Sequence, residues 1–279
     1  MFAKLERLKP YKVVVTPLII TLLVVYSWDY LLALFDIPIP SLLLMLMLGA
    51  ISLLLNSLVI KRVTYRFRKY VSVKDSLWMT SVGILGNSLG LPIGTGAKYY
   101  FWVTRIGLKI KSSLLGIGYF SLLSFGSASI VCLGLLEHRE AIDYLWLALL
   151  LFIIVFVCLA VAASVLVFDG SLSEVVLDWA LAFAAVSFMS ALFALPLAYY
   201  YPHIAVDSVF MLSFGFLALS YLTFVSSIPA GQELLSGAVA LFLGDDFMLG
   251  VGVSLSVRMI YVVCAGVVAL CSKADRQRV

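Results

Sequence analysis

The polar groups that could bind a ligand in this chain lie at two breaks in its apolar sequence. The first break is the stretch NSLGLPIGTGAKYYFW (residues 87–102). A helix that restarts after a break exposes N–H groups without intrahelical partners and the positive end of its dipole, and glycines let a ligand approach this backbone. Helix starts of this kind bind anions, so we expect this break to bind an anionic group such as a lipid phosphate. The candidate residues are Pro92, Gly94, Thr95, Gly96 and Lys98.

A second break has a similar pattern. The stretch SSIPAGQELLSG (226–237) shares an aliphatic-Pro-small-Gly core with the first and is also followed by an ionisable residue. Its candidate residues are Pro229, Gly231 and Glu233. Arg258 joins them as the twelfth residue of the apolar segment 247–271, because a charge near the middle of a membrane costs at least about 2.5–3.5 kcal/mol and indicates function. The sequence leaves three roles open for Arg258. It could bind the ligand, form a structural ion pair with Glu233, or exchange Glu233 for the ligand during transport.

Transmembrane helices are predicted to carry these residues. The 279 residues are 63% hydrophobic and 12% charged, with a mean hydropathy of +1.13, which lies outside the range of soluble domains. The apolar runs are continuous rather than alternating, which excludes a transmembrane β-barrel. Runs of about 20 residues cross a hydrocarbon core of about 30 Å. Six full spans are therefore predicted, at 13–35, 41–60, 111–136, 144–168, 179–201 and 247–271.

The basic residues predict the orientation of the spans. Sixteen of the 19 lysines and arginines lie in the segments 1–12, 61–74, 105–111 and 273–278. The positive-inside rule places all four segments, and with them both chain termini, in the cytoplasm. Region 76–108 must then enter and leave the membrane on the cytoplasmic side, and region 207–244 must do so on the outer side. Both regions are predicted to be re-entrant hairpins, broken at Pro92 and Pro229.

Two features fit this topology less well. Residues 207–228 are long enough to cross the membrane alone, and the predicted cytoplasmic loop 169–178 has three acidic residues and no basic one. Acidic residues carry little weight in the positive-inside rule, so we keep the topology.

The chain divides into two similar halves, about 1–136 and 137–279. Each half contains two spans, a broken hairpin and one more span, and the odd number of crossings inverts the second half relative to the first. Pro92 and Pro229 are 137 residues apart, close to half of the chain. Interrupted segments at matching positions of two halves indicate the binding site of a transporter. Pro and Gly are also common in membrane helices, where they can mark simple kinks.

The two breaks also resemble the signatures of a known membrane family. NSLGLPIGTGAKYYFWVTRIGLKIKSSLLG (87–116) is similar to the first signature of the lysylphosphatidylglycerol synthetase transmembrane, or flippase-like, family. IPAGQELLSGAVALFLG (228–244), followed by SVRMIYVV (256–263), is similar to the second. The residues that match the first motif are Pro92, Gly94, Gly96 and Lys98, and those that match the second are Pro229, Gly231 and Arg258.

The resemblance implies movement of lipids between the two leaflets. In the synthetases, the membrane part flips an aminoacylated phospholipid made by a C-terminal soluble transferase. This chain continues for only eight residues after its last predicted span, so we expect a stand-alone member whose partners are membrane lipids with an anionic or phosphate headgroup. Any synthetic activity would need a separate lipid or glycan synthase. The chain departs from the second motif at Ala230, usually a second Gly, and at Leu235 and Ser236, usually an Arg-Glu pair.

The sequence thus predicts an all-α polytopic protein of the plasma membrane that moves an anionic lipid through a polar cavity between its halves. The alternatives are a secondary carrier of a small solute or ion, a membrane enzyme acting on lipid phosphates, and a non-transporting partner of a synthase. An enzyme is not expected, because the chain has no HExxH, GxSxG or P-loop pattern. We expect no cofactor, no metal and no nucleic-acid partner. His138 and His203 lie 65 residues apart in predicted loops, and orientation explains the net charge of +4.

Overall fold

The computed structural model describes residues 21–22, 24–25, 28, 32, 37–88, 100–138, 145–168, 171–200, 202, 204–221, 231–242 and 246–276. These residues form helices and turns and contain no strand, which confirms the all-α class. Residues 89–99 of the first break (87–102) lie outside the described residues, and so does most of the predicted span 13–35.

Five of the described helices are long and apolar enough to cross a membrane. They are α4 (Ile39–Arg66), α7 (Ile110–His138), α8 (Leu145–Phe168), α9 (Leu172–Tyr200) and α12 (Phe247–Arg276). Each coincides with one of the predicted spans, which confirms a multi-pass membrane protein. The largest difference is at α9, which begins seven residues earlier than the sequence predicts.

Three further described helices are too short to cross a membrane alone. They are α5 (Val73–Ser88), α10 (Val206–Ser220) and α11 (Gly231–Phe242), with 16, 15 and 12 residues. Their lengths are about 24, 22 and 18 Å, against a hydrocarbon core of about 30 Å. Residues 207–228 are long enough to cross alone, but α10 ends at Ser220 and Tyr221 is in a turn.

Short polar motifs set the starts of two helices. At α5, the Ser72 hydroxyl accepts a hydrogen bond from the Asp75 backbone N–H at 3.0 Å and donates one to the Asp75 carboxylate at 2.7 Å. At α9, the Glu174 carboxylate accepts a hydrogen bond from the Ser171 backbone N–H at 3.0 Å. A Ser three residues before an acidic residue is a helix-start signal. The predicted loop 169–178 is therefore wrong, because most of it belongs to α9.

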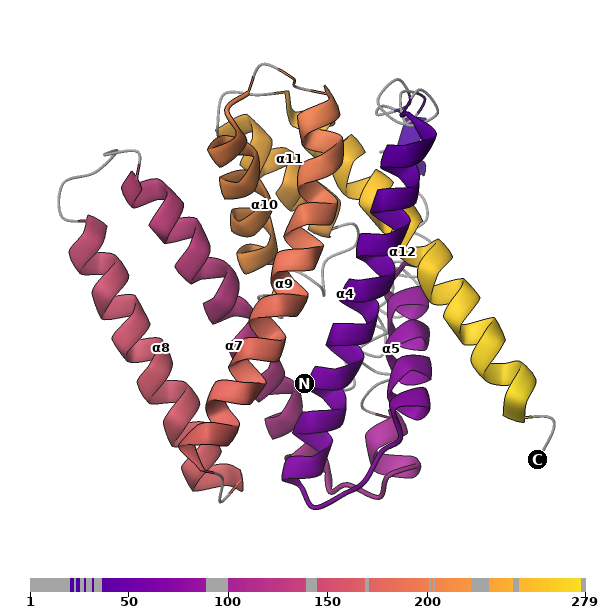
Figure 1. Ribbon diagram of the computed structural model, residues 1–279, viewed down its shortest axis with the longest axis vertical. Coiled ribbons are helices and arrows are strands. Elements are labelled where there is room, and N and C mark those ends of the chain that lie inside the picture. The colour runs from indigo at the N-terminus through magenta and orange to yellow at the C-terminus, as the bar shows by residue number, and fades with distance from the viewer. Residues whose placement is uncertain are drawn as a thin grey trace, which may run out of the picture.

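The helices of the two predicted halves are interleaved. α4 packs along α9, and in Figure 1 the two helices lie side by side at the centre of the bundle. α4 also packs on α12, and α9 on α7. The short helix α5 packs on α12, and the short helix α10 packs on α7. Two of the three short helices, α5 and α10, therefore contact a long helix of the other predicted half, whereas α11 packs on α12 and α10 of its own half.

The peripheral helix α8 is held to the bundle by a close contact with α7. α8 lies at the edge of the bundle in Figure 1, and its most hydrophobic window is only 17% buried, as expected of a helix that faces lipid. Phe156 of α8 is buried and packs directly over Gly126 of α7. Small residues let membrane helices approach in this way.

Gly126→Ala is expected to lower the stability of the protein, because the added Cβ would overlap the Phe156 ring. Overpacking of this kind costs about 1–3 kcal/mol, so the melting temperature in detergent should fall by several degrees. Gly118→Ala in the same helix is the control, since no atom of the described chain lies within 4 Å of its Cβ position. Equal losses in both variants would contradict a specific contact with Phe156.

Candidate functional site

A cavity of about 140 Å³ lies between α5, α9, α11 and α12. Its walls include the apolar residues Ile84 and Phe193 and the polar residues Gln232, Ser254, Arg258 and Tyr261. α5 leads into the first predicted break, and α11 follows the second. The cavity is therefore lined by residues of the helix that precedes the first predicted break and of the helix that follows the second.

Arg258 supplies the charge of this cavity and forms an ion pair with Glu233. Its Nη2 atom lies 2.7 Å from Oε1 of Glu233 and 3.4 Å from Oε1 of Gln232. Glu233 is fully buried, whereas 19% of the Arg258 side chain is exposed. The structure thus brings together two of the predicted site residues, Glu233 and Arg258, in the ion pair that was one of the alternatives given by the sequence.

This ion pair leaves hydrogen-bonding capacity unused. In the part of the chain that the structure describes, neither Glu233 carboxylate oxygen accepts a hydrogen bond of normal geometry, and Nη1 of Arg258 donates none. The short contact between the two side chains is therefore a charge contact rather than a directed hydrogen bond. Arginine commonly holds a carboxylate or a phosphate through two parallel hydrogen bonds, and buried polar groups without partners are costly. Among the described residues, Nη1 of Arg258 thus has no partner and could bind a further group that carries oxygen acceptors.

The start of α11 also favours negative charge. Gly231 is the first residue of α11, so Gln232 and Glu233 lie in the first turn of this helix. Backbone N–H groups in a first turn have no intrahelical acceptor, and the helix dipole is positive there. The other predicted site residues lie outside the described residues: Pro92, Gly94, Thr95, Gly96, Lys98 and Pro229.

Small residues hold α11 close to α12. A Cβ atom on Gly250 of α12 would overlap the backbone carbonyl of Ser236 and would lie 2.9 Å from Cβ of Ala240, both in α11. A Cβ atom on Gly237 would lie 2.6 Å from the Phe247 ring. This contact fixes the position of Glu233 relative to Arg258. Sequence reasoning missed it, although small residues three or four positions apart in an apolar segment are a known packing signal.

Tyr261 links the cavity to the central helices. Asn56 of α4 donates a hydrogen bond from Nδ2 to the Tyr261 hydroxyl at 3.1 Å, and the Ser52 hydroxyl lies 3.4 Å from the same oxygen. Ser52 is also 3.4 Å from the carbonyl oxygen of Ala185 in α9. Polar contacts therefore join α4, α9 and α12 next to the cavity.

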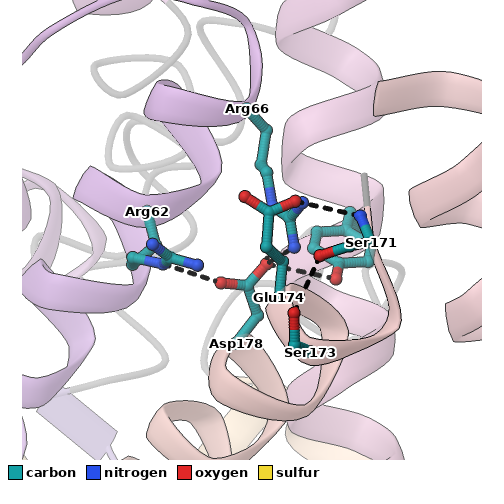
Figure 2. A network of polar contacts seen from close by, with 7 residues as sticks. Arg62, Arg66, Ser171, Ser173, Glu174 and Asp178 are labelled. Carbon is teal, nitrogen blue, oxygen red and sulfur yellow. Dashed lines mark hydrogen bonds and ion pairs between the residues drawn. The ribbon is translucent and has the colours of Figure 1, made fainter. Parts of the chain in front are cut away.

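A second group of charged residues, the α4–α9 cluster, consists of Arg62, Arg66, Glu174 and Asp178 (Figure 2). Asp178 is fully buried and accepts hydrogen bonds from Nε of Arg62 at 3.0 Å and from Nε and Nη2 of Arg66 at 3.0 and 2.9 Å. Arg66 also contacts the Glu174 carboxylate. The Tyr119 hydroxyl of α7 lies 3.3 Å from Oδ2 of Asp178. The α4–α9 cluster therefore joins three helices and balances two positive charges with two negative ones.

The α4–α9 cluster corrects the interpretation of two sequence features. Arg62 and Arg66, assigned to the basic segment 61–74, belong to the last turns of α4. Glu174 and Asp178, assigned to a loop, belong to the first turns of α9. The sequence contained a signal for the pairing, because each pair is spaced four residues apart and so occupies one face of its helix.

Asp178→Asn is expected to destabilise the protein strongly, because it leaves Arg66 buried without its main counter-charge. Removing one partner of a buried ion pair costs about 3–5 kcal/mol, which thermal unfolding in detergent would detect. Glu174→Gln is the matched control, since 35% of the Glu174 side chain is exposed and exposed pairs contribute little. An effect of Asp178→Asn no larger than that of Glu174→Gln would contradict this account.

The charged residues of the described chain do not form a metal site. No group of three His, Cys, Asp or Glu side chains within it could hold a metal ion.

No protein-family model, curated protein or solved structure matches the chain. The resemblance to the flippase-like family therefore rests on the two sequence motifs.

Proposed function

We propose that this protein is an integral membrane translocase that moves an anionic or phosphate-bearing lipid between leaflets. The observation that carries the proposal is the position of Arg258. Its guanidinium lies partway along a helix long enough to cross a membrane, borders a cavity, and has one nitrogen without a partner among the described residues. A charge at such a depth costs about 2.5–3.5 kcal/mol or more, so it marks a functional site by default.

The packing of the helices supports an inverted repeat. Two inverted halves, about 1–136 and 137–279, would exchange their short helices symmetrically, as α5 on α12 and α10 on α7 do. α5 lies toward the lower end of the bundle in Figure 1, and α10 and α11 lie toward the upper end. We propose that these helices belong to two re-entrant hairpins on opposite sides, within about six full spans. Inverted repeats place the substrate at their interface, near the membrane midplane.

The distribution of basic residues supports an orientation. The end of α4, the start of α7 and the end of α12 lie toward the same, lower end of the bundle in Figure 1. These ends belong to the basic segments 61–74, 105–111 and 273–278. By the positive-inside rule, this end faces the cytoplasm. We propose a plasma-membrane protein with both termini on that side.

The cavity suggests how a lipid would be handled. Its volume of about 140 Å³ has room for a phosphate-sized group and several waters but not for acyl chains. The headgroup would bind Arg258 while the tails stay in the bilayer. Lys98 and the glycines of the first break follow α5, whose Ile84 lines the cavity, so we propose that they bind the same headgroup.

The small volume of the cavity also favours a second candidate, a carrier of a small free anion such as inorganic phosphate. Both candidates share the chemistry of an oxyanion on Arg258. They differ in whether the oxyanion is attached to a lipid.

Arg258→Ala is expected to slow lipid movement at least tenfold, because it removes the cationic group of the cavity. The purified protein would be reconstituted in liposomes, and transfer of fluorescent phospholipid and polyprenyl-phosphate analogues between leaflets would be followed. Lys98→Ala should have a similar effect. Lys109→Ala is the control, since it removes an exposed positive charge outside the cavity and should leave the rate unchanged.

A parallel experiment measures uptake of inorganic phosphate by the same liposomes. Phosphate uptake without lipid transfer would replace the translocase by a small-anion carrier. Neither activity, with folded variants, would indicate a non-transporting partner of a synthase and a structural role for Arg258.

A further inference from the structure

We infer that Glu233 is a proton-binding site linked to the anion site, so that an anion binds Arg258 together with one proton taken up by Glu233. The inference rests on the proposed function, because it requires that Arg258 bind an anion. It adds a coupled ion, and therefore an energy source, to the proposed transport.

Glu233 occupies the anion site when no ligand is bound. Its Oε1 atom lies 2.7 Å from Nη2 of Arg258, where an oxygen of a phosphate would bind. A bound anion must displace this carboxylate or share the guanidinium with it. Sharing would leave two negative charges and one positive charge in a largely buried site, which is strongly unfavourable at low dielectric.

Glu233 cannot reach water to compensate for the loss of Arg258. Its side chain is fully buried, and the contact of Gly250 with Ser236 fixes α11 against α12. A carboxylate that is held in place without a counter-charge becomes protonated instead. We infer that the proton arrives from the cavity when the anion binds, since Arg258, the partner of Glu233, lines this cavity.

The other charges near Glu233 are few in the described chain. α11 packs on α10 and α12, and within its bounds α10 has one charged residue, Asp207, in its first turn. On α12, Arg258 is the partner of Glu233, and the hydroxyl of the neighbouring Tyr261 is engaged with Asn56. Lys98 lies outside the described residues. A role for Lys98 as the second counter-charge would remove the need for a proton, so the experiment below must distinguish the two cases.

The binding step balances in charge and in atoms. The binding step starts from three species: the Glu233–Arg258 ion pair, one anion and one proton. It gives a neutral Glu233 carboxyl group and an anion paired with Arg258. One O–H bond forms on Glu233, and no other covalent bond changes. Because raising the pH stabilises the Glu233 carboxylate, it should weaken anion binding by up to tenfold per pH unit.

The test is calorimetric titration of the full-length protein in detergent with dihexanoylphosphatidylglycerol. The phosphodiester of this short-chain lipid keeps one negative charge between pH 5.5 and 8, so the ligand contributes no pH dependence of its own. Titrations in two buffers with different ionisation enthalpies give the number of protons taken up per lipid. We expect close to one proton for the unaltered protein, and affinity that falls as the pH rises.

Glu233→Gln should bind the lipid about tenfold more tightly at pH 8, because the amide competes weakly for Arg258, and should take up no proton. Glu174→Gln is the matched control, since it makes the same change outside the cavity and should behave like the unaltered protein. The proton count of the unaltered protein tests the inference even if Glu233→Gln does not fold.

Lipid binding that Arg258→Ala abolishes but that takes up no proton would overturn the coupling and leave the proposed function standing. That result would assign the second counter-charge to Lys98 or another group. Absence of binding by the unaltered protein would overturn both.

Discussion

Every buried charge in this apolar bundle needs an opposite charge within a few ångströms, and this requirement fixes several of its helices. Transfer of an ion out of water carries a penalty of several kcal/mol, which a partner in good geometry can offset. Asp178 meets the requirement through Arg62 and Arg66, which tie α9 to α4. Glu233 meets it through Arg258, which ties α11 to α12. The register of both helix pairs is therefore set by charge as well as by apolar packing.

The spans could be predicted from the sequence because bilayer thickness sets the length of an apolar run. α7 and α8 differ from the predicted spans by no more than two residues at either end. The start of α9 could not be found from hydropathy, since Glu174 and Asp178 resemble loop residues until their partners are known. Those partners, Arg62 and Arg66, lie more than 100 residues earlier in the chain. Only the capping motif at Ser171 was a local signal.

Part of the candidate site could also be predicted from the sequence. A charge at the depth of Arg258 requires a partner, and Glu233 is the acidic residue that follows the second break, so their pairing could be anticipated. The walls of the cavity could not be predicted from the sequence. Ile84 and Phe193 are ordinary apolar residues of different helices, and only tertiary packing brings them beside Arg258. Local pattern therefore identifies the charges of a membrane site better than its shape.

The two charged groups differ in a way that separates a structural role from a functional one. In the α4–α9 cluster both oxygens of Asp178 accept hydrogen bonds from arginines, although Nη2 of Arg62 has no partner among the described residues, so an open guanidinium nitrogen does not by itself mark a ligand site. At the cavity, Glu233 and Arg258 meet through one charge contact, and Nη1 of Arg258 has no partner among the described residues. A pair that served only to hold helices together would gain stability by closing the second hydrogen bond of the guanidinium fork. At the cavity both Glu233 oxygens also lack a hydrogen bond among the described residues, and leaving acceptors and donor open together beside a cavity sacrifices stability, as ligand-binding sites commonly do.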